Sequence, residues 1–420
     1  MRIRRSLTST VSANARARFP VAGRQKLLGG ESGIAGVLCG GRYFCGEKTM
    51  LKHYIPVGKE RLRCGYTTGT CAAAAARGAA ERLRTGHWPE AVELTTPAGV
   101  PVRVELEALQ TGPGWASCAV RKDAGDDPDV TGGALVFARV ERTAGEGITI
   151  DGGEGVGRVT RPGLDQPVGA AAINSVPRRM IAEQLRSAGM TGASVVISIP
   201  AGAALAGKTF NPRLGIEGGI SVLGTSGIVR PMSEAALVDS IRLELETVRA
   251  RGAKHVLVTP GNYGEDFSRD VLGLNLDNWA LCSNYAGESI DHAAMLGFES
   301  YLLVGHLGKL VKLAGGAMNT HSKTADGRRE TLTAHAALCG AEGPLLRELF
   351  GSATTDRAVE LLDGAGLREP VLSSVAAALE ERLRCRAGGM RIAAVFFSNV
   401  YGVLGKTTDA DELLARHRAR

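Results

Sequence analysis

HVLVTPGNYGE (255–265) begins the stretch that decides the fold, because an apolar strand pattern runs directly into a small, polar loop with two glycines. The same succession returns in WALCSN (279–284) and in SYLLVGHLGK (300–309), with helical patterns in between. Strands that alternate with helices predict parallel βαβ units. Residues 251–350 are therefore predicted to form a Rossmann-like domain.

The loops that follow these strands are expected to lie together at the carboxyl edge of the sheet, where open α/β folds bind ligands. Each loop alone is weak evidence, and GNYGE is not a dinucleotide fingerprint. Taken together, they predict a cofactor crevice. The candidate cofactor-binding residues are Gly261, Asn262, Gly264, Glu265, Ser283, Asn284, Gly287, Glu288, Gly305 and His306.

The region upstream of these loops has a different pattern. Apolar and polar residues alternate over 92–106 on both sides of a Pro-Ala-Gly turn, which predicts a β-hairpin. Further strands are expected at 134–141 and 194–200, whereas the glycine-dense stretch 145–157 is expected to form only loop or turn. Residues 50–250 are thus predicted to be an α+β domain with a mixed, largely antiparallel sheet, which places the chain in the α/β class.

The tail, residues 351–420, holds helical patterns at 357–366 and 373–384 and a strand pattern at 392–397. A strand that follows two helices often returns to an existing sheet. The sequence leaves open which domain this tail joins.

A threonine-rich turn, TTGT (67–70), precedes an alanine-rich helix that Gly86 is expected to end. The free N–H groups at the start of such a helix would suit a carboxylate or a phosphate. Ordinary capping by Thr68 or Thr70 would explain the same residues. The glycines of 210–229 are similarly open to two interpretations, close approach to a ligand or to a neighbouring strand.

The formal charge of +7 would suggest a nucleic-acid partner if it were spread over the protein. Instead, residues 1–49 hold nine basic and two acidic residues, and the remainder holds 41 of each. We therefore expect no nucleic-acid partner. Residues 1–49 are interpreted as an atypical basic extension that is unstructured or not native, with Met50 as the biological start.

Other function classes lack their motifs. The eight cysteines form no CxxC pair, which favours a reducing cytoplasm, and no apolar run reaches the ~18 residues of a membrane span. We expect a cytoplasmic, soluble protein without a membrane partner. Because HExxH, GxSxG and Walker motifs are missing as well, we expect no protein-held metal, no hydrolase and no P-loop kinase.

Five segments in order resemble the cobalt-precorrin-5B C1-methyltransferase family over roughly residues 60–405. They are LRCGYTTGTCAAAAARGAA (62–80), GKTFNPRLGIEGGISVLGTSGIVRPMSEAAL (207–237), VTPGNYGED (258–266), CSNYAGESIDHAAMLGF (282–298) and LLVGHLGKLVKLAGGAMNTHSKTADGR (302–328). The departures are the basic extension and two tyrosines, Tyr263 and Tyr285, at loop positions expected to vary.

The resemblance implies an enzyme of the anaerobic cobalamin (corrin) pathway. It would transfer a methyl group from S-adenosylmethionine to C1 of cobalt-precorrin-5B, which yields cobalt-precorrin-6A. The S-adenosylmethionine would bind in 251–350 and the tetrapyrrole in 50–250, while cobalt would enter only inside the substrate. Two alternatives remain: a non-catalytic protein that binds or delivers a corrinoid intermediate, and a methyltransferase for another tetrapyrrole carbon.

The implied acceptor is a small-molecule tetrapyrrole that carries many carboxylates, so basic and N–H-rich groups are its candidate contacts. The polar stretch 316–330 could bind carboxylates through its arginines or could equally be a solvated loop. The candidate substrate-binding residues are Thr67, Thr68, Thr70, Arg63, Lys208, Arg213, Arg230, Lys309, Asn319, His321 and Arg328. Catalytic residues are not identified by the sequence, and a homo-oligomer is left open.

Overall fold

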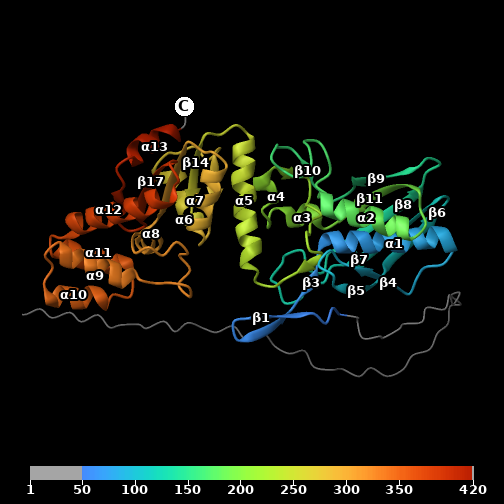
Figure 1. Ribbon diagram of the computed structural model, residues 1–420, viewed down its shortest axis with the longest axis horizontal. Coiled ribbons are helices and arrows are strands. Elements are labelled where there is room, and N and C mark those ends of the chain that lie inside the picture. The colour runs from blue at the N-terminus through green and yellow to red at the C-terminus, as the bar shows by residue number, and fades with distance from the viewer. Residues whose placement is uncertain (1–49, 419–420) are drawn as a thin grey trace, which may run out of the picture. The chain divides into compact units, whose positions relative to one another are not determined.

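The computed structural model describes residues 50–418, drawn as ribbons in Figure 1. The expectations for residues 1–49 lie outside the described residues. The described part holds two five-stranded sheets, the first packed in one hydrophobic core and the second between two others. None of its helices combines the length and the apolar composition needed to cross a membrane.

The first five-stranded sheet has the order β6-β7-β8-β11-β9. Its neighbours pair antiparallel except β9, which runs parallel to β11. The prediction of a mixed, largely antiparallel sheet is therefore confirmed. The strands are β6 (Glu107–Gly112), β7 (Trp115–Arg121), β8 (Leu135–Arg142), β9 (Gly147–Gly152) and β11 (Gly192–Ser198).

Strand β9 shows that one prediction was wrong, because it lies inside 145–157, where only loop was expected. Ile148 and Ile150 alternate with polar residues along the strand, and both pack against the first core. The glycines at both ends of the segment hid this period-two pattern.

Two helices, α1 (Thr68–Thr85) and α2 (Ser175–Ser187), pack against each other, and α1 also contacts β7 and β8 (Figure 1). Residues 72–76 of α1, all alanines, are completely buried in the same core as Val136 and Val140. Small side chains allow a helix to approach a sheet closely, which explains the alanine-rich composition. The helix ends where predicted, at Gly86 in the left-handed conformation.

The predicted hairpin is confirmed as β4 (Ala91–Thr95) paired antiparallel with β5 (Pro101–Glu105). Ser233 caps α5 (Glu234–Ala250), whose Ile241, Leu245 and Val248 are buried. The other elements before the second sheet are short: β1 (Tyr54–Val57), β2 (Glu60–Arg63), β3 (Gly65–Tyr66), β10 (Arg158–Val159), α3 (Gly202–Ala206), α4 (Asn211–Leu214), β12 (Ile216–Glu217) and β13 (Ile228–Val229).

Backbone contacts account for one of the glycine clusters that the sequence left open. A Cβ atom on Gly219 would overlap the carbonyl group of Gly155, and one on Gly155 would overlap the carbonyl oxygen of Ile199. Gly202 approaches the same Gly155 carbonyl. At these positions the glycines bring three backbone segments together, so a neighbouring chain segment, not a ligand, explains them.

The second sheet has the order β15-β14-β16-β17-β18. The first four strands are parallel, which confirms the parallel pairing predicted for β14, β15 and β16, and β18 is antiparallel to β17. Because β17 pairs with β16, the tail joins this second sheet. The strands are β14 (His255–Thr259), β15 (Trp279–Leu281), β16 (Ser300–His306), β17 (Arg391–Ser398) and β18 (Gly402–Lys406).

Helices line both faces of this sheet. The larger core contains residues of α5, α7 (Ala286–Met295), α8 (Leu307–Ala314), α9 (Arg328–Leu338), α10 (Gly343–Phe350), α11 (Thr355–Gly364) and α12 (Arg368–Arg386). A smaller core on the other face contains residues of the π-helical turn Phe267–Val271 and of α13 (Ala410–Arg416). The turn follows α6 (Asn262–Asp266), and its Phe267 stacks on Phe397 of β17 with ring centroids 3.8 Å apart.

His417, which follows α13, makes a prediction about acid stability possible. It is 4% exposed, and its Nε2 has no hydrogen-bond partner in the described structure. Burial lowers its pKa to about 4, helped by the nearby His255 and Arg416. Below the ordinary pKa of 6.5 the unfolded chain therefore binds a proton on His417 that the folded chain does not bind, and this lowers the free energy of unfolding. The loss is absent above pH 6.5 and grows as the pH falls towards 4.

We expect His417→Leu to remove this acid sensitivity. Between pH 7 and pH 4.5 the wild-type free energy of unfolding should fall by about 2 kcal/mol more than that of the variant. Urea unfolding at a series of pH values measures the difference. Parallel stability curves for the two proteins would contradict the prediction.

Candidate functional site

A cavity of about 990 Å³ opens at the carboxyl ends of the parallel strands. It lies where the strand order reverses, because β14 connects to β15 on one side and the chain then returns to β16 on the other. Such a reversal is where open α/β sheets bind ligands. Eight of the sequence candidates line it: Gly261, Gly264, Asn284, Gly305, His306, Lys309, His321 and Arg328.

The glycines of this cavity differ in what surrounds them. A Cβ on Gly305 would overlap Leu310 and come within 3.1 Å of Pro260, and one on Gly264 would lie 2.7 Å from the Val304 oxygen. These two glycines let the loops after β14 and β16 pack closely. Gly261 has nothing within 4 Å of a Cβ position. It is therefore the predicted glycine at which a ligand has room to approach the backbone.

His306 joins β16 to α8, and a hydrogen bond from the backbone defines which of its ring nitrogens is the acceptor. Its Nδ1 accepts a hydrogen bond from the Gly308 N–H at 3.1 Å, so the proton of the neutral ring is on Nε2. Burial lowers the pKa of His306, although the nearby Asp356 carboxylate opposes the shift. The ring is thus a neutral hydrogen-bond donor, and it lacks the free lone pair that a general base needs.

Two lysines of α8 face the loops around the cavity. Lys309 Nζ donates to the carbonyls of Pro260 and Ser283, at 3.0 and 3.4 Å. Lys312 Nζ donates to the Thr320 carbonyl at 3.0 Å. Lys312 is not among the sequence candidates. The sequence could have indicated it, because this lysine interrupts an otherwise apolar helix face in LVKLA (310–314).

The loop between α8 and α9 forms another wall. Asn319 Oδ1 accepts from the His321 N–H at 2.9 Å, and Asn319 itself does not line the cavity. Arg328 makes two hydrogen bonds to Asp326, at 2.6 and 2.8 Å, and this arginine holds the pKa of Asp326 at about 2. The Arg328 guanidinium already binds the Asp326 carboxylate, so a ligand carboxylate would have to bind beside it.

Asp356 is the one carboxylate among the described residues that line the cavity. It lies in the first turn of α11, and its Oδ1 accepts from Ser398 Oγ at 2.8 Å. Sequence reasoning missed it, although Ser398 ends a fourth parallel strand and the next residue, Asn399, also lines the cavity. Recognising that the final strand returns to this sheet would have brought the pair into the site.

Four of the cofactor candidates, Asn262, Glu265, Ser283 and Gly287, lie beside the cavity residues without lining the space, as does Glu288 on α7. Arg213 Nη2 approaches Glu265 Oε2 to 3.6 Å, and the same guanidinium lies 4.9 Å above the Trp279 ring. Gly287 packs against Arg386 and Met318. The structure thus gives several of these residues protein partners.

The threonine turn contacts another part of the protein. Thr67 is the N-cap of α1 and accepts from the Thr70 N–H at 3.2 Å, which corrects the expected capping by Thr68 or Thr70. The correction arises because the helix begins one residue earlier than expected. Thr68 Oγ1 bonds the Leu223 backbone at 3.0 and 3.2 Å, and Thr70 Oγ1 donates to the Gly227 carbonyl at 2.8 Å.

The remaining upstream candidates also lie away from the large cavity. Arg63 donates twice to Asp123, at 2.5 and 2.9 Å, while Lys208 and Arg230 are exposed. Thr67 and Thr68 line a different cavity of about 300 Å³. The structure therefore does not bring the upstream candidates and the strand-end candidates into one cavity.

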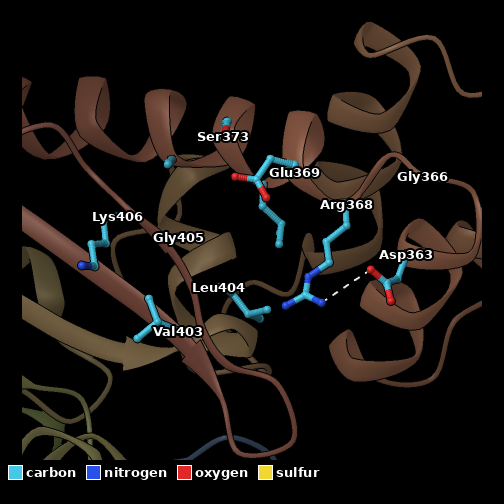
Figure 2. A pocket seen from close by; sticks show the side chains of 11 residues that line it. Asp363, Gly366, Arg368, Glu369, Ser373, Val403, Leu404, Gly405 and Lys406 are labelled. Carbon is cyan, nitrogen blue, oxygen red and sulfur yellow. Dashed lines mark hydrogen bonds and ion pairs between the residues drawn. The ribbon is translucent and has the colours of Figure 1, made fainter. Parts of the chain in front are cut away.

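Another hollow, of about 640 Å³, lies between α12 and β18 (Figure 2). In Figure 2 the Arg368 side chain points toward Asp363, and the two groups are 3.5 Å apart. Its lining includes none of the sequence candidates. It also lies away from the ends of the parallel strands that carry the polar loops, so the larger cavity is the candidate site.

Comparisons with known proteins cover most of the chain. The family model described as CbiD matches residues 55–231, and CbiD, C-terminal domain, matches residues 319–408. A protein from Ruminiclostridium cellulolyticum named cobalt-precorrin-5B C(1)-methyltransferase is 47% identical over 83% of this chain and 92% of its own length. A protein of the same name from Alkaliphilus metalliredigens is 44% identical over 87% and 97%.

Among solved structures, a cobalamin biosynthesis protein (cbiD) from Archaeoglobus fulgidus is similar in sequence, with 31% identity. The match covers 66% of this chain and 87% of that chain, with a TM-score of 0.37.

Proposed function

The chain belongs to the CbiD family, and on that premise we propose that it methylates C1 of cobalt-precorrin-5B in cobalamin biosynthesis. The observation that carries the proposal is the 47% identity to a relative with this name over 92% of the relative's length. A match over 83% of this chain and 92% of the relative is not an isolated motif. The chain is a methyltransferase.

The methyl donor that we propose is S-adenosylmethionine, bound in the cavity of about 990 Å³. The donor would supply an electrophilic methyl group on a sulfonium sulfur. The residues present fit such a molecule: Gly261 leaves open space at the end of β14, His306 offers an Nε2–H donor, and Asp356 has a carboxylate oxygen to spare. Adjacent cationic groups, Lys323 and Arg328, could contact the donor's own carboxylate.

The residue assignment of the donor site is also a proposal. We retain the three strand-end loops as its frame and add Asp356 as the acceptor for ribose hydroxyls or the donor's ammonium group. Glu265 and Glu288, two of the cofactor candidates, are not assigned a donor contact, because both lie outside the cavity lining.

The chemistry asks the protein mainly to align the two reactants and exclude water. The acceptor carbon of an electron-rich macrocycle is itself the nucleophile, so no covalent enzyme intermediate is required. Correct orientation can supply about 7–11 kcal/mol of the barrier. His306, as a neutral donor, would orient a ligand and is not assigned proton abstraction. Cobalt would be part of the substrate.

Incubation of the purified protein with S-adenosylmethionine and cobalt-precorrin-5B tests this function. We expect the macrocycle to gain the mass of one CH2 group and S-adenosylhomocysteine to appear. A 13C-labelled methyl group, located by NMR, should be attached to C1. Binding of the macrocycle without a gain in mass would instead support a delivery protein, and a label at another carbon would change the assigned position.

The cytoplasmic location stays a prediction, as do the absence of nucleic-acid partners and the possible homo-oligomer.

A further inference from the structure

Lys312 is a buried cation whose hydrogen-bonding capacity is already used. Its side chain is 2% exposed, and the nearest carboxylate oxygen, on Asp326, is 3.8 Å away. The closer partners of Nζ are neutral: the Thr320 carbonyl at 3.0 Å, Ser322 Oγ at 2.9 Å and the Ala325 carbonyl at 3.3 Å. An ammonium group has three N–H donors, so these contacts leave none for a ligand.

Such an arrangement needs a reason, because burying a charge is costly even when a carboxylate lies 3.8 Å away, as Asp326 does. All three neutral partners belong to the loop at 320–325, which contributes His321, Ser322 and Lys323 to the cavity. Lys312 therefore draws this loop onto α8. Thr320 is fixed a second time, because its Oγ1 donates to Asn284 Oδ1 at 3.2 Å.

Lys309 likewise holds two other walls of the cavity, the loops that follow β14 and β15. It stands on the helix after β16, yet it donates to Pro260 at the end of β14 and to Ser283 at the end of β15. Ser283 has a φ of 52°, a left-handed conformation that is unfavourable for a residue other than glycine. The Lys309 contact helps to hold that conformation. These contacts use two of the three N–H donors of Lys309 Nζ, so one donor remains.

We propose that Lys309 and Lys312, one turn apart on α8, are positioning residues that assemble the cavity walls, with Lys312 making no contact to substrate. This proposal rests on the proposed donor site. It also changes the expectation for Lys309, whose main role becomes joining strand ends and not pairing with substrate carboxylates.

Limited trypsin digestion without any ligand tests the loop role directly. Lys323 is exposed on the loop that Lys312 holds. We expect Lys312→Met, which keeps the apolar stem and removes the donors, to accelerate cleavage after Lys323 about tenfold or more, because cleavage follows local opening. Lys309→Met should leave this rate within about twofold. The exposed Lys254→Met serves as the matched control.

Ser322→Ala provides a milder second variant, since it deletes one acceptor on an exposed residue and preserves folding. It should accelerate the same cleavage by a smaller factor. The proposal is overturned if both Lys312→Met and Ser322→Ala cleave at the wild-type rate while circular dichroism shows them folded, or if Lys312→Met is unfolded and Ser322→Ala is unchanged.

Calorimetry with S-adenosylhomocysteine completes the test. Both lysine variants should bind it about tenfold or more weakly than the Lys254→Met control. If the wild-type protein does not bind S-adenosylhomocysteine, the donor site is wrong, and the digestion result still decides the loop role. If Lys312→Met loses affinity without faster cleavage, a direct contact replaces positioning and the proposal fails.

Discussion

Asp356→Asn is expected to weaken the binding of S-adenosylhomocysteine by about 10- to 100-fold, the usual loss when a hydrogen bond to a charged group is removed. Asp356 is the one carboxylate of the described cavity lining, and among the described residues the only hydrogen-bond donor to this carboxylate is Ser398. The asparagine has the same size. Its amide keeps an oxygen for Ser398, so the variant loses charge with little change in packing.

Glu265→Gln and Glu288→Gln are the matched controls for Asp356→Asn. Both replace a carboxylate by an amide at residues near the same strand ends, but outside the cavity lining. Isothermal calorimetry should show affinities within about threefold of the wild type for both. Thermal melting should show all three variants folded. If a Glu→Gln variant loses more affinity than Asp356→Asn, the donor lies elsewhere among the loops.

Gly155→Ala is expected to produce the largest loss of stability. Gly155 has a φ of 70°, where alanine is strained by about 1–2 kcal/mol. The added Cβ would also overlap the Ile199 carbonyl oxygen, a backbone atom that cannot move without shifting β11 or the turn after it. Overpacking adds about 1–3 kcal/mol. We expect a total loss of about 3–5 kcal/mol, or a protein that fails to fold.

The control for Gly155→Ala is Gly207→Ala, at an exposed glycine that ends α3, the short helix that begins at Gly202. Gly207 has a φ of –62° and open space around its Cβ position. Alanine there should change the free energy of unfolding by less than about 1 kcal/mol. Urea unfolding of both variants gives the comparison. Equal stabilities would show that the three backbone segments do not meet as described.

The sequence predicted most elements whose pattern is local. The hairpin β4–β5, the end of α1 at Gly86 and the parallel strands β14 to β16 follow from periodicity and capping within short windows. Strand β9 was missed, although its alternation is equally local, because glycines surround it. The partner of β17 could not be predicted, because it lies on β16, about ninety residues earlier.

The candidate site was predicted to the level of its loops and not of its side chains. Parallel strands end at one edge, so their loops had to meet, and eight candidates do line one cavity. The sequence could not tell which charged groups would be used up by protein partners. The Arg63 guanidinium donates both of its side-chain hydrogen bonds to Asp123, and Arg213 pairs with Glu265. Each of these pairs joins residues more than fifty positions apart.

The α/β class, the three strand-end loops and the family could be predicted from the sequence, because they depend on local periodicity and on the order of short motifs. The folded arrangement was needed to see that Asp356 enters the cavity, that Lys312 holds a loop, and that the threonine turn holds the segment around Leu223. The physical reason is that burial and hydrogen-bond partners are set by contacts between distant segments, which no local pattern records.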